Sequence, residues 1–139
     1  MSIEFLAIGG FNEVGKNMAA IKIDDEIVIL DMGFFIPRLL DIEEENNSKE
    51  FLTREKLIKI GAAPDDSVLD SQLSNVKAII LGHAHLDHLG GAPYLAGKYD
   101  APIIGTPYTM EVLKRIISDK GVKLKNKIKI VSPGRRFDI

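Results

Sequence analysis

The sequence lacks cysteine, and it has only three histidines among its 139 residues. Without cysteine there is no disulfide and no thiolate metal site, so a cytoplasmic protein is favoured over a secreted one, and any metal must be held by imidazole and carboxylate groups. No apolar run approaches the ~20 residues that a membrane span requires. The opening MSIEFLAIGG also lacks the charged start and long apolar segment of a signal peptide. We therefore expect a cytoplasmic protein that does not enter a membrane.

Composition limits the chain to one folding unit, and the charged residues are unevenly distributed along it. With 45% hydrophobic and 27% charged residues, the chain can bury one core and shows no bias towards disorder, so we expect one domain or part of one. The formal net charge of -2 conceals an acidic segment, 41–50, with five acids against one lysine. Segment 111–139 carries nine lysines and arginines against three acids, which makes it the candidate region for contacts with an anionic partner.

Hydrophobic periodicity predicts three short strands, an insertion and a buried strand in the first part of the chain. The first three are β-branched and bounded by turn residues, and Asp24-Asp25 is expected to form a hairpin turn. An acidic helical insertion should occupy about 37–74, with a short helix that Thr53 caps and Gly61 ends, and with mobility around EEENNS at 43–48. The expected strands are Ile3–Ile8, Ala19–Ile23, Glu26–Gly33 and the nearly all-apolar Val76–Leu81, buried on both faces.

Alternating helices and strands are expected in the second part of the chain. Pro93 suits the first turn of a short helix through Lys98, and a brief strand should follow at 102–104. Thr106-Pro107 should open a longer helix whose apolar face packs on the sheet. The segment Val122–Val131 alternates lysines with apolar residues and predicts a half-exposed strand. The order β-β-β, insertion, β, α, β, α, β therefore indicates a layered α/β protein. The expected apolar face of the longer helix consists of Val112, Leu113, Ile116 and Ile117.

All three histidines lie in one stretch, ILGHAHLDHLGGAP, at 80–93. His83 and His85 are two apart just after a strand, so in extended backbone they point the same way with Cα atoms ~7 Å apart and can converge on one cation. Asp87 and His88 follow in a turning chain and can reach a second cation nearby. A lone histidine after a strand is more often structural, but three histidines and an aspartate in H-x-H-x-D-H register predict half of a dinuclear site. Imidazole nitrogen with carboxylate oxygen suits Zn²⁺, or Mn²⁺, which would generate hydroxide for hydrolysis.

The register HAHLDH resembles the signature of the metallo-β-lactamase fold. GGFNEVGKN at 9–17, followed by IVILDMG at 27–33, is similar to the opening of the β-CASP nucleases of that superfamily, and within them most similar to the ribonuclease J family, with an archaeal character in the long acidic insertion. The resemblance covers 3–33 and 76–107 and is weak across the insertion. It implies an α/β fold that is the N-terminal half of an αββα sandwich, with a mixed sheet and helices packed on one face.

The resemblance also implies roles for particular residues. His83 and His85 would bind the first metal ion, and Asp87 and His88 would bind the second and act in catalysis. Asp31 would orient the metal-binding loop through hydrogen bonds; from the sequence alone it is equally well a strand-end carboxylate that satisfies a turn. Two Zn²⁺ ions per complete site are implied, with Mn²⁺ as the alternative. The glycines at 9, 10 and 15 would allow unusual backbone angles near the site, or would belong to a plain hairpin loop.

The activity implied by the resemblance is metal-hydroxide hydrolysis of RNA phosphodiesters, as a 5′ exonuclease that can also cut internally. The family takes a further histidine, a bridging aspartate and a distal histidine from downstream sequence, and this chain has no fourth histidine. We therefore expect residues 1–139 to be the N-terminal part of a metallo-β-lactamase domain, with the rest of the catalytic domain and the β-CASP domain absent. Alone, the chain is expected to be inactive, to hold metal weakly and to form a homo-oligomer.

Two other functions stay open at this point. The chain could be a non-catalytic metal- or RNA-binding module, or another metallo-β-lactamase-fold hydrolase such as a glyoxalase II-like thioesterase, although the GGFNEVGKN loop argues against the thioesterase. The lysine-rich strand has two interpretations as well: contacts to RNA, or protection of a sheet edge, of which we favour the second. The basic residues concerned are Lys123, Lys125, Lys127, Lys129, Arg135 and Arg136.

Overall fold

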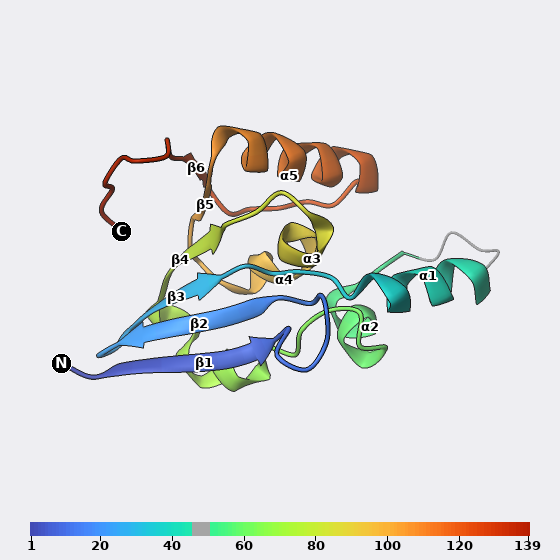
Figure 1. Cartoon of the computed structure of the whole chain (residues 1–139), viewed down its shortest axis with the longest axis horizontal. Helices are drawn as coiled ribbons and strands as arrows, with labels where there is room; N and C mark the ends of the chain where they lie inside the picture. Colours follow the sequence, from blue (N-terminus) through green and yellow to red (C-terminus); the bar gives the residue numbers. More distant parts are fainter. Residues whose placement is uncertain (46–50) are drawn as a thin grey trace.

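The computed structural model describes residues 1–45 and 51–139, with side chains for 1–41 and 51–139. Within these residues, six strands form one mixed sheet in sequence order (Figure 1). The first three strands pair antiparallel, and the third to the sixth pair parallel. This arrangement confirms the predicted α/β fold with a mixed sheet. The strands are β1 (Ile3–Gly9), β2 (Met18–Ile23), β3 (Glu26–Leu30), β4 (Val76–Leu81), β5 (Ile103–Gly105) and β6 (Ile128–Ile130).

The hairpin of β2 and β3 forms as predicted, with its turn at Asp24-Asp25, where Asp24 has a φ of 52°. Strand β3, however, ends at Leu30 and not at Gly33. The reason is Asp31, whose φ of 60° turns the backbone out of the extended conformation while its N–H still donates to the Ile80 carbonyl at 2.9 Å. The chain therefore leaves the sheet beside the end of β4.

Among the described residues between the parallel strands β3 and β4 there are three helical pieces: α1 (Ile36–Glu45), α2 (Arg54–Lys59) and the 3₁₀ segment η1 (Ser67–Asn75). The short predicted helix is confirmed as α2, because the Thr53 side chain accepts from the Lys56 N–H and Gly61 follows with a φ of 75°. Leu57 and Leu69 are fully buried, so this crossover connection is part of the core. The expectation of mobility around EEENNS falls at 46–48 on residues outside the described ones.

The helices after β4 are α3 (Leu86–Leu89), α4 (Ala92–Leu95), the 3₁₀ turn η2 (Ala96–Lys98) and α5 (Pro107–Lys120). The helix expected between Pro93 and Lys98 is thus divided into α4 and η2. Thr106 caps α5 by accepting from the Thr109 N–H, and Gly121 ends it in the left-handed conformation. On α5, Leu113 is fully buried and its predicted neighbours on the same face are partly buried, as an amphipathic helix on a sheet requires.

The predicted strand Val122–Val131 is wrong over most of its length, because only Ile128–Ile130 pairs as β6. Its partner β5 has three residues, so the ladder can extend no further. Upstream, the Asn126 side chain anchors the chain by donating to the carbonyls of Ala96, Tyr99 and Ala101 at 2.9–3.1 Å. The alternation of exposed lysines with partly buried side chains over 122–128 is nevertheless present, with Asn126 as the polar member among the partly buried ones.

Helices cover one face of the sheet. Ile29, Ile79 and Ile103, which are paired neighbours on successive strands, are fully buried in one cluster with side chains from α2 to α5. The opposite side is uncovered at the β1 end, where Ile3, Phe5 and Ile23 are 63%, 59% and 46% exposed. We call these three residues the exposed apolar face. Among the described residues, no helix is long and apolar enough to cross a membrane.

A buried ion cluster ties the crossover segment to the chain after α4. Asp66 is fully buried and contacts the Arg54 guanidinium, the Lys98 ammonium at 3.1 Å and the Tyr99 hydroxyl, which donates to it at 2.6 Å. Burial, followed by the hydrogen bond to Asp66, raises the pKa of Tyr99 and keeps its hydroxyl protonated as a donor. The cluster fixes η1 against η2 and so supports β4 at its N-terminal end.

Candidate metal centre

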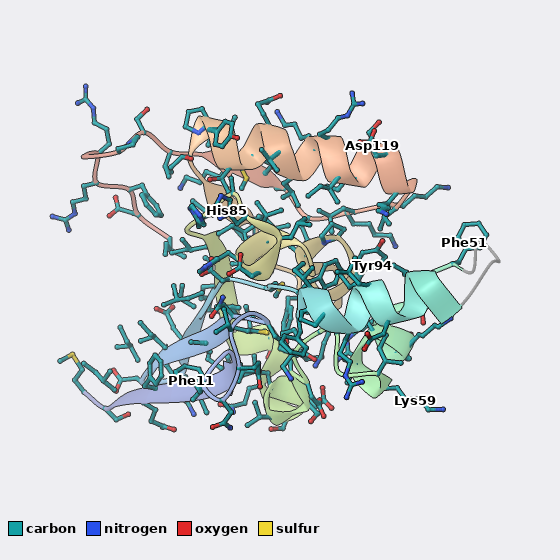
Figure 2. The ribbon with its side chains drawn as sticks, turned by 45° about the vertical axis from the view of Figure 1, so that its right-hand side comes forward. Phe11, Phe51, Lys59, His85, Tyr94 and Asp119 are labelled. Atoms are coloured by element: carbon teal, nitrogen blue, oxygen red, sulfur yellow. The ribbon has the colours of Figure 1, made fainter. Side chains whose placement is uncertain are left out.

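The histidine-rich segment leaves the sheet at the carboxyl end of β4. Leu81 is buried there, whereas His83 and His85 are exposed, and their rings lie with centroids 4.0 Å apart. The ring of His88, on α3, lies 5.2 Å from that of His83. Figure 2 shows His85 beyond the end of β4 and beneath α5. The structure therefore brings all three predicted imidazoles together.

Asp31 links β3, β4 and α3 through its two carboxylate oxygens. Oδ1 accepts from the Gly82 N–H at 2.8 Å, and Oδ2 lies 2.8 Å from His88 Nδ1. A carboxylate on Nδ1 fixes the orientation of the imidazole and leaves Nε2 as its remaining nitrogen. Asp31 adopts a left-handed φ of 60°, an uncommon conformation that a short polar side chain with local partners tolerates. The geometry fits the orienting role expected of Asp31.

Backbone hydrogen bonds hold α3 against the segment that follows β3. The N–H groups of Met32 and Phe34 donate to the carbonyls of His88 and Leu86, each at 2.8 Å. On the other side of the same segment, Gly33 donates to the Asn17 carbonyl at 2.9 Å. Residues 31–34 are thus bonded both to the loop that precedes β2 and to the turn that carries Asp87 and His88. These backbone bonds fix the position of the turn independently of any ligand.

The donor atoms have the chemistry of a Zn²⁺ or Mn²⁺ site but do not form a complete ligand set. Asp87 Oδ2 lies 3.5 Å from His88 Nε2, so the carboxylate and the third imidazole face one another. Among the described residues, however, no group of three or more histidine or acidic side chains is arranged to hold a metal ion. A zinc ion in a catalytic site normally keeps three protein ligands. The gathered donors therefore fit part of a centre.

An open apolar groove lies beside the candidate donors. Its cavity volume is about 600 Å³, and His85 and Asp87 line one side of it. The remaining lining is apolar and comes from the loop before β2, α1, the segment after β4, α3 and α5. It thus opens directly onto two of the four candidate ligands. The apolar lining residues are Val14, Ile36, Ala84, Leu86, Val112 and Ile116.

Two residues that contact the candidate site were not assigned by sequence reasoning. Asn17 donates from its side chain to the Asp87 carbonyl at 2.9 Å, and Gly33 lies so close to Asp87 that an added Cβ would overlap its carbonyl oxygen. Asn17 is the last residue of the motif GGFNEVGKN and Gly33 the last of IVILDMG, and these two motifs are the sequence signal for both positions. Of the three glycines singled out in the sequence, Gly10 and Gly15 have the unusual φ values of 84° and 126°, whereas Gly9 ends β1 without a positive φ.

A comparison with protein families agrees with the fold. The model of the Metallo-beta-lactamase superfamily matches residues 12–136, which is most of the chain. The chain belongs to the metallo-beta-lactamase superfamily, and membership implies metal dependence.

Curated relatives narrow the comparison to one group of proteins. The chain is 46% identical, over its full length, to "Ribonuclease J" of Methanocaldococcus jannaschii and 43% identical, over 81% of its length, to "Ribonuclease J" of Pyrococcus abyssi. It is 33% identical, over 92% of its length, to "Ribonuclease J2" of Bacillus subtilis. The matched regions make up 31%, 24% and 20% of those proteins, so the chain spans about a third of their length or less.

Proposed function

We propose that the chain is the N-terminal part of a metal-dependent ribonuclease of the ribonuclease J type. The observation that carries this proposal is the 46% identity, along the whole chain, to a protein named ribonuclease J. It is joined by the clustering of His83, His85 and His88 at the carboxyl ends of β3 and β4. These relatives do not favour a thioesterase. RNA is the proposed substrate, the cytoplasm the proposed location, and a β-CASP domain the proposed companion in the longer protein.

Four residues would hold the metal ions in this proposal. His83 and His85 would take one cation, and Asp87 and His88 would take the other and act at the reacting phosphate. Zn²⁺ is the proposed ion, with Mn²⁺ as the alternative, because the donors are imidazole nitrogen and carboxylate oxygen. Bound cations of this kind supply a hydroxide near neutral pH and neutralise charge on the phosphate. Further ligands would come from the rest of the longer protein, since no set of three is complete among the described residues.

The remaining residues of the site would position these donors. Asp31 holds His88 Nδ1 and the Gly82 N–H, so it fixes both ends of the segment that carries the ligands. The backbone bonds from Met32 and Phe34 then keep α3 in place. Prearranged donors lose little freedom when a cation binds, which favours binding and a fixed geometry for attack.

The experiment that tests the proposal is RNA cleavage by the longer protein with single ligands removed. His85→Ala and Asp87→Ala should each reduce the rate by at least ~100-fold, because even partners that only support metal ligands contribute about 10–100-fold. Asn12→Ala, an exposed change in the loop before β2, is the matched control and should cleave normally. Cleavage near the wild-type rate in both ligand variants would contradict the assignment. Products analysed by length would separate 5′ exonuclease action from internal cutting.

A further inference from the structure

We propose that Asn17 is a positioning residue that holds Asp87 and His88 ready for a cation. The inference rests on the proposed function, because it concerns the donors assigned there to the second metal ion. Asn17 lies immediately before β2, in a loop distant in sequence from α3. The contacts of its side-chain nitrogen are nevertheless with the two adjacent candidate ligands.

The first contribution of Asn17 is a double hydrogen bond to the backbone between the ligands. Its main-chain N–H donates to the Asp87 carbonyl at 3.1 Å, and its side-chain Nδ2 donates to the same oxygen at 2.9 Å. Two donors on one carbonyl use both of its lone pairs and fix the direction of the peptide group. Because this peptide joins Asp87 to His88, its orientation sets how both side chains leave the backbone.

The second contribution comes from the remaining hydrogen on Nδ2. This nitrogen lies 3.4 Å from Asp87 Oδ2 and 3.5 Å from His88 Nε2, the two atoms that would bind the cation. Asp31 holds the opposite nitrogen of the same imidazole at 2.8 Å. His88 is therefore held at Nδ1 by Asp31 and faced at Nε2 by the Asn17 amide. A cation taken by Nε2 and Oδ2 would replace only these long contacts and leave the bonds to the Asp87 carbonyl intact.

The chemistry of the side chain explains why asparagine suits this position. An alanine would remove the Nδ2 bond and leave only the main-chain N–H on the Asp87 carbonyl. A serine would keep a donor, but its shorter side chain would not reach from the loop to both ligands. Asn12 provides a matched control, because it is the same residue type in the same loop and is exposed.

The test is a Zn²⁺ titration of the 139-residue chain. It is monitored through the ¹⁵N NMR signals of the three imidazoles. In the wild type, we expect His88 Nε2 to respond to zinc. In Asn17→Ala the zinc concentration at half-response of His88 should rise about 10-fold, while that of His83 stays near the wild-type value. Asn12→Ala should match the wild type at both residues. Selectivity for His88 is the readout that a general loss of stability would not produce.

Other outcomes of the titration would overturn the positioning role of Asn17, or the metal site as well. A half-response of His88 that is unchanged in Asn17→Ala, or a shift shared equally by His83, would overturn the positioning role and leave the metal site standing. Imidazole signals that do not respond to zinc in the wild type, both in the 139-residue chain and in the longer protein, would overturn the proposed metal site together with this inference. If Asn17→Ala does not fold, as judged by its amide spectrum, Asn17→Ser should show the same selective shift at His88, and its absence there would also overturn the role.

Discussion

Replacing Gly33 by alanine should disrupt the candidate site through one close backbone approach. A Cβ at Gly33 would stand 1.6 Å from the Asp87 carbonyl oxygen and 2.2 Å from its carbonyl carbon. Contacts of real Cβ atoms are essentially never shorter than 3.0 Å, so the carbonyl would have to retreat by about 1.4 Å, the difference between the two distances. The atoms that clash are backbone, which cannot rotate away as a flexible side chain can. The turn that carries Asp87 and His88 must therefore move as a unit.

The loss in the free energy of unfolding follows from the hydrogen bonds that this movement breaks. Three main-chain bonds hold the turn: Met32 to His88, Phe34 to Leu86, and Asn17 to Asp87. At about 1 kcal/mol each, their loss lowers the free energy of unfolding by about 3 kcal/mol. A displacement of this size near the reacting atoms is also expected to reduce RNA cleavage by the longer protein by at least ~100-fold.

The assay compares chemical denaturation of the 139-residue chain carrying Gly33→Ala with that of the chain carrying Gly97→Ala. An added Cβ at Gly97 meets no atom within 4 Å, so that control should remain within about 1 kcal/mol of the wild type. Equal stability of the two variants, together with normal cleavage by Gly33→Ala in the longer protein, would show that a Cβ at Gly33 does not displace the turn that carries Asp87 and His88.

Three further predictions concern stability and association. Asp66→Ala should lower the free energy of unfolding by about 3–5 kcal/mol in a denaturation curve, because it removes the buried carboxylate shared by Arg54, Lys98 and Tyr99, of which only Lys98 keeps another acidic partner, Asp70; a loss below about 1 kcal/mol would contradict this. The 139-residue chain should self-associate through its exposed apolar face, and a stable monomer in light scattering would show the opposite. Replacing four lysines with glutamine should increase aggregation and scarcely change the salt dependence of RNA binding by the longer protein, whereas a lower salt slope would indicate phosphate contacts. These are Lys123, Lys125, Lys127 and Lys129.

The elements that sequence reasoning located correctly are those with local signals. Strand β4 was bounded correctly because its apolar run is sharply delimited, and α2 and α5 were located by their caps, Thr53 and Thr106. The prediction of a strand over the whole of 122–131 was wrong for a physical reason. Alternation reports which side chains face the protein, and it holds there, but a strand also needs a partner, and β5 offers only three residues. The length of a pairing partner far away in the chain cannot be read from a local pattern.

In the candidate site, too, the features with a local sequence signal were predicted and those that depend on tertiary contacts were not. The register of His83, His85, Asp87 and His88 predicted a cluster, because spacing after a strand determines which way neighbouring side chains point. The contacts of Asn17 with Asp87 join residues 70 positions apart, and no periodicity reports such a contact. Gly33 likewise has its role only because another backbone passes beside it. Tertiary packing, and not local preference, decides these two positions.

The most direct test of the central claim is RNA cleavage by the longer protein before and after metal removal. A chelator should abolish cleavage, and addition of Zn²⁺ or Mn²⁺ should restore it in the wild type, because the imidazole and carboxylate donors around His83 and His88 would regain their cation. We expect full loss and recovery in the wild type and no recovery in His88→Ala. Cleavage that persists in the chelated wild type, or that metal restores equally in His88→Ala, would contradict it.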